Sequence, residues 1–127
     1  MKKILALTLT VTLTGCAAIT DKIPSFWDDN QSAAIVSVRQ AVDTLDCQQP
    51  HALQVKVIKD QLRWFELYSE SKGTKDVARL VKPMQETVND FYKRSVEKEG
   101  SEAYCNSKKK VMEVQGKTIA EAVLGRF

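Results

Sequence analysis

The sequence predicts an all-α fold, a small up-down-up-down four-helix bundle with one disulfide. Apolar residues recur at spacings of three and four along four segments, which is the pattern of helices with one buried face. No segment alternates in the manner of a strand, and two cysteines fall where such a bundle brings helix ends together. A chain of 127 residues, 43% of them hydrophobic, is sufficient for one such domain.

The first helix is expected to begin after Asp28 and Asp29, because acidic side chains favour the positive end of a helix dipole. Its buried face comprises Ile35, Val38, Val42 and Leu45. The helix is expected to run to about Cys47, before Gln48-Gln49-Pro50 breaks it. Pro50 then suits the first turn of the next helix.

The second helix has one apolar stripe of Val55, Ile58, Leu62, Phe65 and Tyr68. The segment from Ser69 to Thr74 is expected to end it, because Gly73 favours a helix C-terminus. The third helix begins near Thr74 and ends at Glu99-Gly100-Ser101. Its stripe is Val77, Leu80, Val81, Met84, Val88, Phe91 and Val96. Pro83 lies inside this segment and is expected to kink it or split it, because proline removes one backbone hydrogen bond.

The fourth helix carries Tyr104, Val111, Met112, Ile119, Val123 and Leu124. Gly116 lies in the middle of this helix and argues against an unbroken one, because glycine is a weak helix former.

The N-terminal segment has the features of a secretory signal. Lys2 and Lys3 are followed by an apolar stretch that is too short to span a bilayer. The sequence Leu13-Thr14-Gly15-Cys16 then resembles the lipobox of bacterial lipoproteins. The resemblance implies that the thiol of Cys16 receives diacylglycerol and that the mature, palmitate-bearing chain begins there. An ordinary signal peptide with an unmodified cysteine is the alternative.

This resemblance divides the chain into a signal peptide at 1–15, a lipidated cysteine and tether at 16–26, and a periplasmic helical domain at 27–127. Two or more acyl chains would anchor the protein stably. Ala17 follows the cysteine where aspartate would be a retention signal in enterobacterial lipoproteins. The expected location is therefore the periplasmic face of the outer membrane, with the inner membrane as the alternative.

Once Cys16 is assigned to the lipid, an even number of cysteines remains in an oxidising compartment, namely Cys47 and Cys105. The end of the first helix and the start of the fourth lie at the same pole of an up-down-up-down bundle, so the two cysteines are expected to form a disulfide. Two free thiols are the alternative. A metal site is not expected, because His51 is the only histidine and such sites need three or four ligands.

The sequence contains no phosphate loop, zinc-protease motif or nucleophile elbow. His51 is expected to be solvated or to cap a helix, because no activated nucleophile can be assigned to it. Lys108 to Lys110 are expected to form one exposed helical turn, with contact to anionic lipid or peptidoglycan as the alternative. We therefore expect no enzyme, no cofactor and no metal. A net charge of +3 without clustering also argues against nucleic acid.

Three aromatic residues are candidates for contact with a partner. Trp64 lies off the core stripe of the second helix, and tryptophan is enriched at binding hot spots; packing against the third helix is the alternative. Phe26 and Trp27 follow the lipidated cysteine closely. They are expected to staple the first helix onto the bundle or to rest at the membrane interface.

These features predict a non-enzymatic lipoprotein that binds another envelope protein. In coarse architecture the chain resembles the pilotins of type II secretion, which are lipidated and helical with two cysteines bracketing the middle helices. No family motif matches residue by residue. A phage-type envelope lipoprotein, acting in superinfection exclusion or lysis, is the alternative function. An enzyme or a small-ligand carrier is the third possibility.

Overall fold

The computed structural model describes residues 26–126, which form five α-helices and no strand. The helices are α2 (Asp29–Asp43), α3 (His51–Ser71), α4 (Lys75–Arg79), α5 (Lys82–Glu97) and α6 (Glu102–Leu124). The predicted all-α class is confirmed. The predicted signal peptide, the lipobox with Cys16, and the tether up to residue 25 lie outside the described residues.

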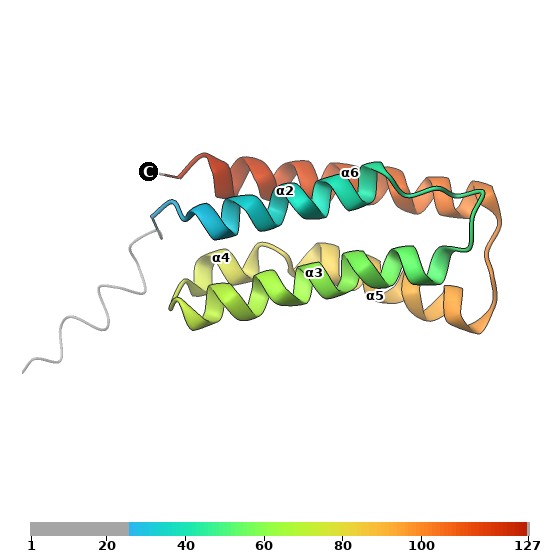
Figure 1. Cartoon of the computed structure of the whole chain (residues 1–127), viewed down its shortest axis with the longest axis horizontal. Coiled ribbons are helices and arrows are strands. Elements are labelled where there is room, and N and C mark those ends of the chain that lie inside the picture. The colour runs from blue at the N-terminus through green and yellow to red at the C-terminus, as the bar shows by residue number, and fades with distance from the viewer. Residues whose placement is uncertain (1–25, 127) are drawn as a thin grey trace, which may run out of the picture.

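The helices lie along one another in an elongated body (Figure 1). α2 packs against α3 and α6, and α3 packs against α4 and α5. The start of α2, the turn from α3 to α4 and the end of α6 lie at one end of the body, which we call the N-terminal end. The α2–α3 and α5–α6 connections lie at the opposite end, which we call the disulfide end.

The predicted apolar stripes form most of the core. Its fully buried members include Ile35, Val38, Val55, Ile58, Leu62, Phe65, Val77, Val81, Met84, Val88, Phe91 and Met112. Three predicted members are wrong: Val96, Val111 and Leu124 are 60%, 43% and 43% exposed. Each lies one position from a buried residue, and one position rotates a helical side chain by about 100°. Ser95, for example, occupies the core position beside Val96 and donates its hydroxyl to the Phe91 carbonyl at 2.8 Å.

The boundaries of α2 are confirmed at its start and wrong at its end. Asp28 is the N-cap, and its Oδ1 accepts a hydrogen bond from the backbone N–H of Gln31 at 2.9 Å. The helix ends at Asp43, four residues before Cys47. Lys109 of α6 explains this early end, because its ammonium donates to the carbonyls of Asp43 and Leu45, both at 3.0 Å.

Pro83 splits the third predicted helix, as expected. α4 ends at Arg79, α5 begins at Lys82, and the proline occupies the first turn of α5, where no backbone N–H is needed. The break suggested by Gly116 is absent, because α6 continues through it. Gly116 is buried against α2, where an added Cβ would lie 3.4 Å from Cγ of Arg39, so packing holds the helix through this position.

Candidate functional site

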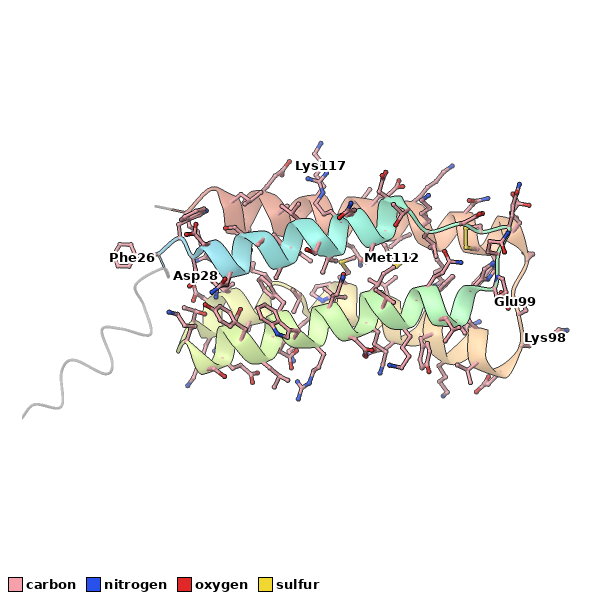
Figure 2. All side chains as sticks on the ribbon, viewed as in Figure 1. Phe26, Asp28, Lys98, Glu99, Met112 and Lys117 are labelled. Carbon is pink, nitrogen blue, oxygen red and sulfur yellow. A yellow bond between two sulfur atoms is a disulfide. The ribbon has the colours of Figure 1, made fainter. Side chains whose placement is uncertain are left out.

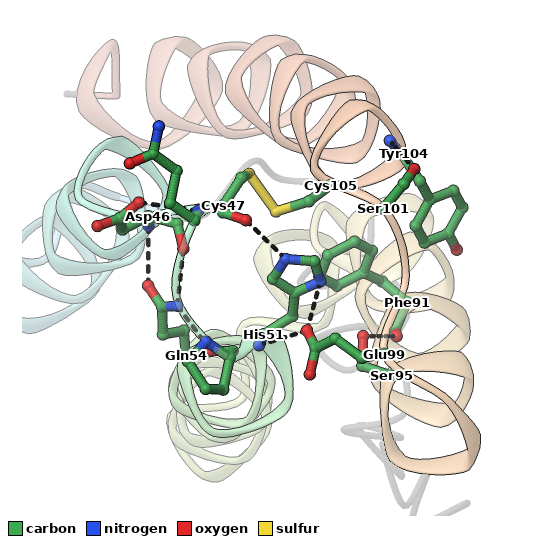
Figure 3. Close-up of polar contacts among 12 residues, drawn as sticks. Asp46, Cys47, His51, Gln54, Phe91, Ser95, Glu99, Ser101, Tyr104 and Cys105 are labelled. Atoms are coloured by element: carbon green, nitrogen blue, oxygen red, sulfur yellow. Dashed lines mark hydrogen bonds and ion pairs between the residues drawn. A yellow bond between two sulfur atoms is a disulfide. The ribbon is translucent and has the colours of Figure 1, made fainter.

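A disulfide joins Cys47 and Cys105 at the disulfide end, with their Cα atoms 5.6 Å apart, which confirms the predicted pairing (Figure 3). Cys47 lies in the α2–α3 loop, not at a helix end, and Cys105 lies in the first turn of α6. Ser101 begins that helix by accepting a hydrogen bond from Tyr104 N–H at 3.1 Å. The disulfide therefore links the α2–α3 loop to the start of α6.

His51 is buried beside this disulfide, and Pro50 is the N-cap of α3, so the prediction of a solvated or helix-capping histidine is wrong. Its Nε2 lies 3.0 Å from the Cys47 carbonyl oxygen, and its Nδ1 lies 2.9 Å from Oε1 of Glu99. The same carboxylate oxygen accepts the backbone N–H of His51 at 2.9 Å. The ring also stacks on Phe91, with centroids 6.0 Å apart. These contacts hold the two connections of this end together, which is a structural role (Figure 3).

Trp64 lies on the surface of α3, off the core stripe as predicted. Its side chain is 51% exposed, and its ring lies almost parallel to that of Tyr68, with centroids 5.0 Å apart. The Tyr68 hydroxyl accepts a hydrogen bond from Asn30 at 2.9 Å and donates to Oδ2 of Asp28 at 3.3 Å. These hydrogen bonds to the start of α2 fix the Tyr68 ring in place. The exposed indole of Trp64 therefore stacks on a ring that is already ordered.

A small hollow of about 300 Å³ opens beside Trp64, between α2 and α3. Its lining is Asn30, Ala33, Ala34, Ser37, Gln61 and Trp64. We call this hollow, together with the Trp64–Tyr68 pair, the aromatic notch. Small side chains on α2 create the space, and the Oε1 atom of Gln61 is buried without a hydrogen-bond partner in the described part of the chain. The notch therefore offers an aromatic wall beside small side chains.

Sequence reasoning found Trp64 but missed the rest of the notch. The spacing of Ala33 and Ser37 was the available signal, because residues four apart lie on one helix face. Trp64 lies on the α2 side of α3, so the alternative of packing against the third predicted helix is wrong.

A larger groove of about 800 Å³ runs between α2 and α6. Val36 and Val114, 51% and 67% exposed, contribute apolar surface, and Arg39, Asp43 and Lys117 supply charge. Sequence reasoning placed no site here. The groove has aliphatic and charged lining without an aromatic anchor, which distinguishes it from the notch.

The predicted aromatic staple is wrong for Phe26. This side chain is 74% exposed and points away from the helices (Figure 2), and Trp27 is 45% exposed. Polar contacts fix the start of α2 instead, since Asp28 caps the helix and accepts a hydrogen bond from Tyr68.

The lysine run is only partly exposed, so the prediction of one exposed turn is wrong. Lys108 lies 3.6 Å from Asp90 and 5.6 Å from the centroid of Tyr104. Lys109 binds the carbonyls after α2, and Lys110 alone of the three is exposed. Two of the three lysines thus hold helices together.

Glu66 is the one acidic side chain among the buried polar residues of the described chain. It forms ion pairs with Arg63 and with Lys82, the latter at 2.9 Å, which joins α3 to α5. Burial acts to raise the pKa of Glu66, but hydrogen bonds from Lys82 and Gln85 and the two nearby positive charges outweigh burial. The pKa is therefore held below its ordinary value of 4.5.

Within residues 26–126, no three histidine, cysteine or acidic side chains gather in a way that could hold a metal ion. No described helix is both long and apolar enough to cross a membrane. Comparison with known proteins gives no match: no family model, curated protein or solved structure matches this chain.

Proposed function

We propose that the chain is a bacterial envelope lipoprotein, anchored by lipid on Cys16, that binds another envelope protein and catalyses no reaction. The anchor places it at the periplasmic face of the outer membrane. The aromatic notch is the binding site, and the helices serve as its scaffold. In this proposal α4 and α5 count as one interrupted helix of an up-down-up-down four-helix bundle.

The anchor is supported by the lipobox sequence Leu13-Thr14-Gly15-Cys16. The disulfide between Cys47 and Cys105 also supports it, since structural disulfides persist in oxidising compartments such as the periplasm. The third cysteine is then the one that remains for lipid attachment.

Protein binding is supported by one main observation: Trp64 is half exposed yet held by stacking on Tyr68. A surface tryptophan is a frequent hot-spot residue, and a side chain that is already ordered loses little entropy on binding. The adjacent hollow has room for an apolar side chain of the partner. We therefore expect an apolar anchor residue of the partner to insert beside Trp64.

The anchor is tested by Cys16→Ala. We expect the wild-type protein to float with membranes in a density gradient and the variant to remain in the soluble fraction, because the variant has no thiol for acylation. Mass analysis of the wild-type protein should show acyl chains on Cys16. An unchanged membrane fraction for the variant would refute the lipid anchor.

The binding site is tested by Trp64→Ala in the lipidated protein. We expect capture of its specific envelope partner to weaken by about 30-fold, since a hot-spot tryptophan contributes at least about 2 kcal/mol. Leu53→Ala is the matched control, because Leu53 is a 76% exposed apolar residue of the same helix, remote from the notch. Equal loss in both variants, or loss in neither, contradicts the assignment.

A further inference from the structure

We propose that the N-terminal end of the molecule docks on the lipid surface, with Phe26 and Trp27 at the membrane interface and the disulfide end directed away. The inference rests on the proposed lipid anchor at Cys16. It adds a second attachment, made by protein side chains, that orients the anchored domain.

The first supporting observation is where the exposed aromatic residues lie. Phe26 is 74% exposed, Trp27 is 45% exposed, and Figure 2 shows Phe26 projecting beyond the helices. Leu124, in the last turn of α6, adds a 43% exposed apolar side chain at the same end (Figure 1). Apolar surface from two ends of the chain therefore gathers at one end of the body.

The second observation is the short distance along the chain from the proposed lipid to these residues. Nine residues, Ala17 to Ser25, separate Cys16 from Phe26. Even fully extended they span only about 30 Å. The N-terminal end is thus the part of the domain that the anchor keeps nearest to the bilayer. Aromatic side chains are enriched at the level of the lipid headgroups, where tryptophan keeps its ring apolar and its N–H hydrated.

The third observation is the charge of the N-terminal end, which decides whether electrostatic or apolar attraction holds it on the lipid surface. Lys72 is exposed at this end but lies 3.8 Å from Asp28, and Arg126 pairs with Asp76 at 2.7 Å. Acidic residues also balance the exposed Lys75 at the start of α4, since Asp29 and Glu70 are exposed at the same end, so attraction to anionic lipid contributes little. Docking is therefore aromatic in character, and it should be insensitive to salt and to the fraction of anionic lipid.

The test exploits the presence of two tryptophans in the sequence, Trp27 and Trp64. Lipidated full-length protein carrying Trp64→Phe reports on Trp27 alone, and Trp27→Phe reports on Trp64 alone. Each is reconstituted into phosphatidylethanolamine–phosphatidylglycerol vesicles containing phospholipid brominated on its acyl chains, which quenches nearby tryptophan fluorescence. We expect at least twofold quenching of Trp27, less than one-fifth loss for Trp64, and no change between 50 and 500 mM salt.

The outcomes separate the inference from the proposed anchor. Failure of the wild-type protein to carry acyl chains and float overturns the anchor, and the docking with it. If the acylated protein floats but Trp27 is quenched no more than Trp64, or is not quenched at all, the docking alone is overturned. Protection of Trp27 from acrylamide in native envelopes, without quenching in vesicles, would assign these residues to a protein partner and also overturn it. Phe26→Ser in the Trp64→Phe background should at least halve the quenching while leaving flotation unchanged.

Discussion

At the scale of single residues, the disulfide end depends on a few side chains that each serve several contacts. Glu99 accepts the backbone N–H of His51 and lies against its ring, while the other ring nitrogen meets the Cys47 carbonyl. The disulfide then ties that loop to α6 through Cys105. These contacts give the backbone N–H and the ring of the buried His51 polar partners, which explains how the histidine is accommodated at this end.

Replacing both Cys47 and Cys105 with alanine should lower the free energy of unfolding by about 4 kcal/mol. The disulfide closes a loop of about 60 residues, and its loss increases the conformational entropy of the unfolded chain. Urea denaturation followed by circular dichroism measures the difference, with reduced wild-type protein as a second sample. A loss below about 1 kcal/mol would show that the His51 contacts hold this end without the disulfide.

At the scale of helices, two positions that disfavour helix formation have opposite outcomes. Pro83 divides α4 from α5, because the chain can leave the helix between Arg79 and Lys82 and restart with proline in a first turn. Gly116 leaves α6 intact, because packing of this buried position beside Arg39 of α2 offsets the weak helix propensity of glycine. Tertiary contact thus decides which of the two interrupts a helix.

Gly116→Ala should raise the free energy of unfolding by about 0.5–1 kcal/mol, because alanine has the higher helix propensity and the nearest group is the flexible stem of Arg39. Gly116→Leu should lower it by about 1–3 kcal/mol through overpacking against α2 and Met84. Thermal denaturation of the variants tests both signs.

Gly73→Ala is the matched comparison for this pair. Gly73 has φ +73°, where an L side chain is strained, so the same glycine-to-alanine change should lower stability by about 1 kcal/mol. Destabilisation of similar size at both glycines would contradict the expected gain at Gly116 and show that this position has no room for a methyl group.

At the scale of the whole molecule, charges contribute to stability mainly by joining helices. The buried carboxylate of Glu66 links α3 to α5 through Lys82, and the exposed Asp90 on α5 lies near Lys108 on α6. A hydrogen bond from Arg94 holds the pKa of Asp90 below its ordinary value, in the same direction as that of Glu66. Both carboxylates therefore favour the folded state when they are ionised.

Stability should fall at acid pH, and Glu66→Gln should reduce this dependence. The lowered pKa of Glu66 gives stability that is fully present above its unfolded value near 4.5 and is lost as pH falls through the lower folded value. At pH 7 the variant should be less stable by about 1–2 kcal/mol, because hydrogen bonds to a charged group are lost. The difference between the two proteins should shrink as pH falls below 4.5.

Urea denaturation of both proteins from pH 7 to pH 2.5 measures this convergence. Asp90 remains in the variant and should leave a shallow residual slope. A constant difference between the two proteins across this pH range would contradict a role for the Glu66 charge.

The helices, most of their buried faces, the Asp28 cap, the interruption at Pro83 and the disulfide could be predicted from the sequence. Each follows from spacing or chemistry within a few residues, or from the parity of the cysteines in one compartment. Trp64 could be placed on the surface for the same reason, since its neighbour Phe65 occupies the core position. Local patterns carry this information because a helix buries one face wherever its partners lie.

Features that depend on residues far apart in the chain could not be predicted from the sequence. His51 is buried where Glu99, 48 residues later, binds its backbone N–H, and α2 ends early because Lys109 of α6 binds the carbonyl of its last residue. The notch exists because small residues of α2 face Trp64 of α3. Apolar periodicity specifies which face of each helix turns inward, whereas the position of each helix along its neighbours places these groups together, and that position is set by packing of the whole domain.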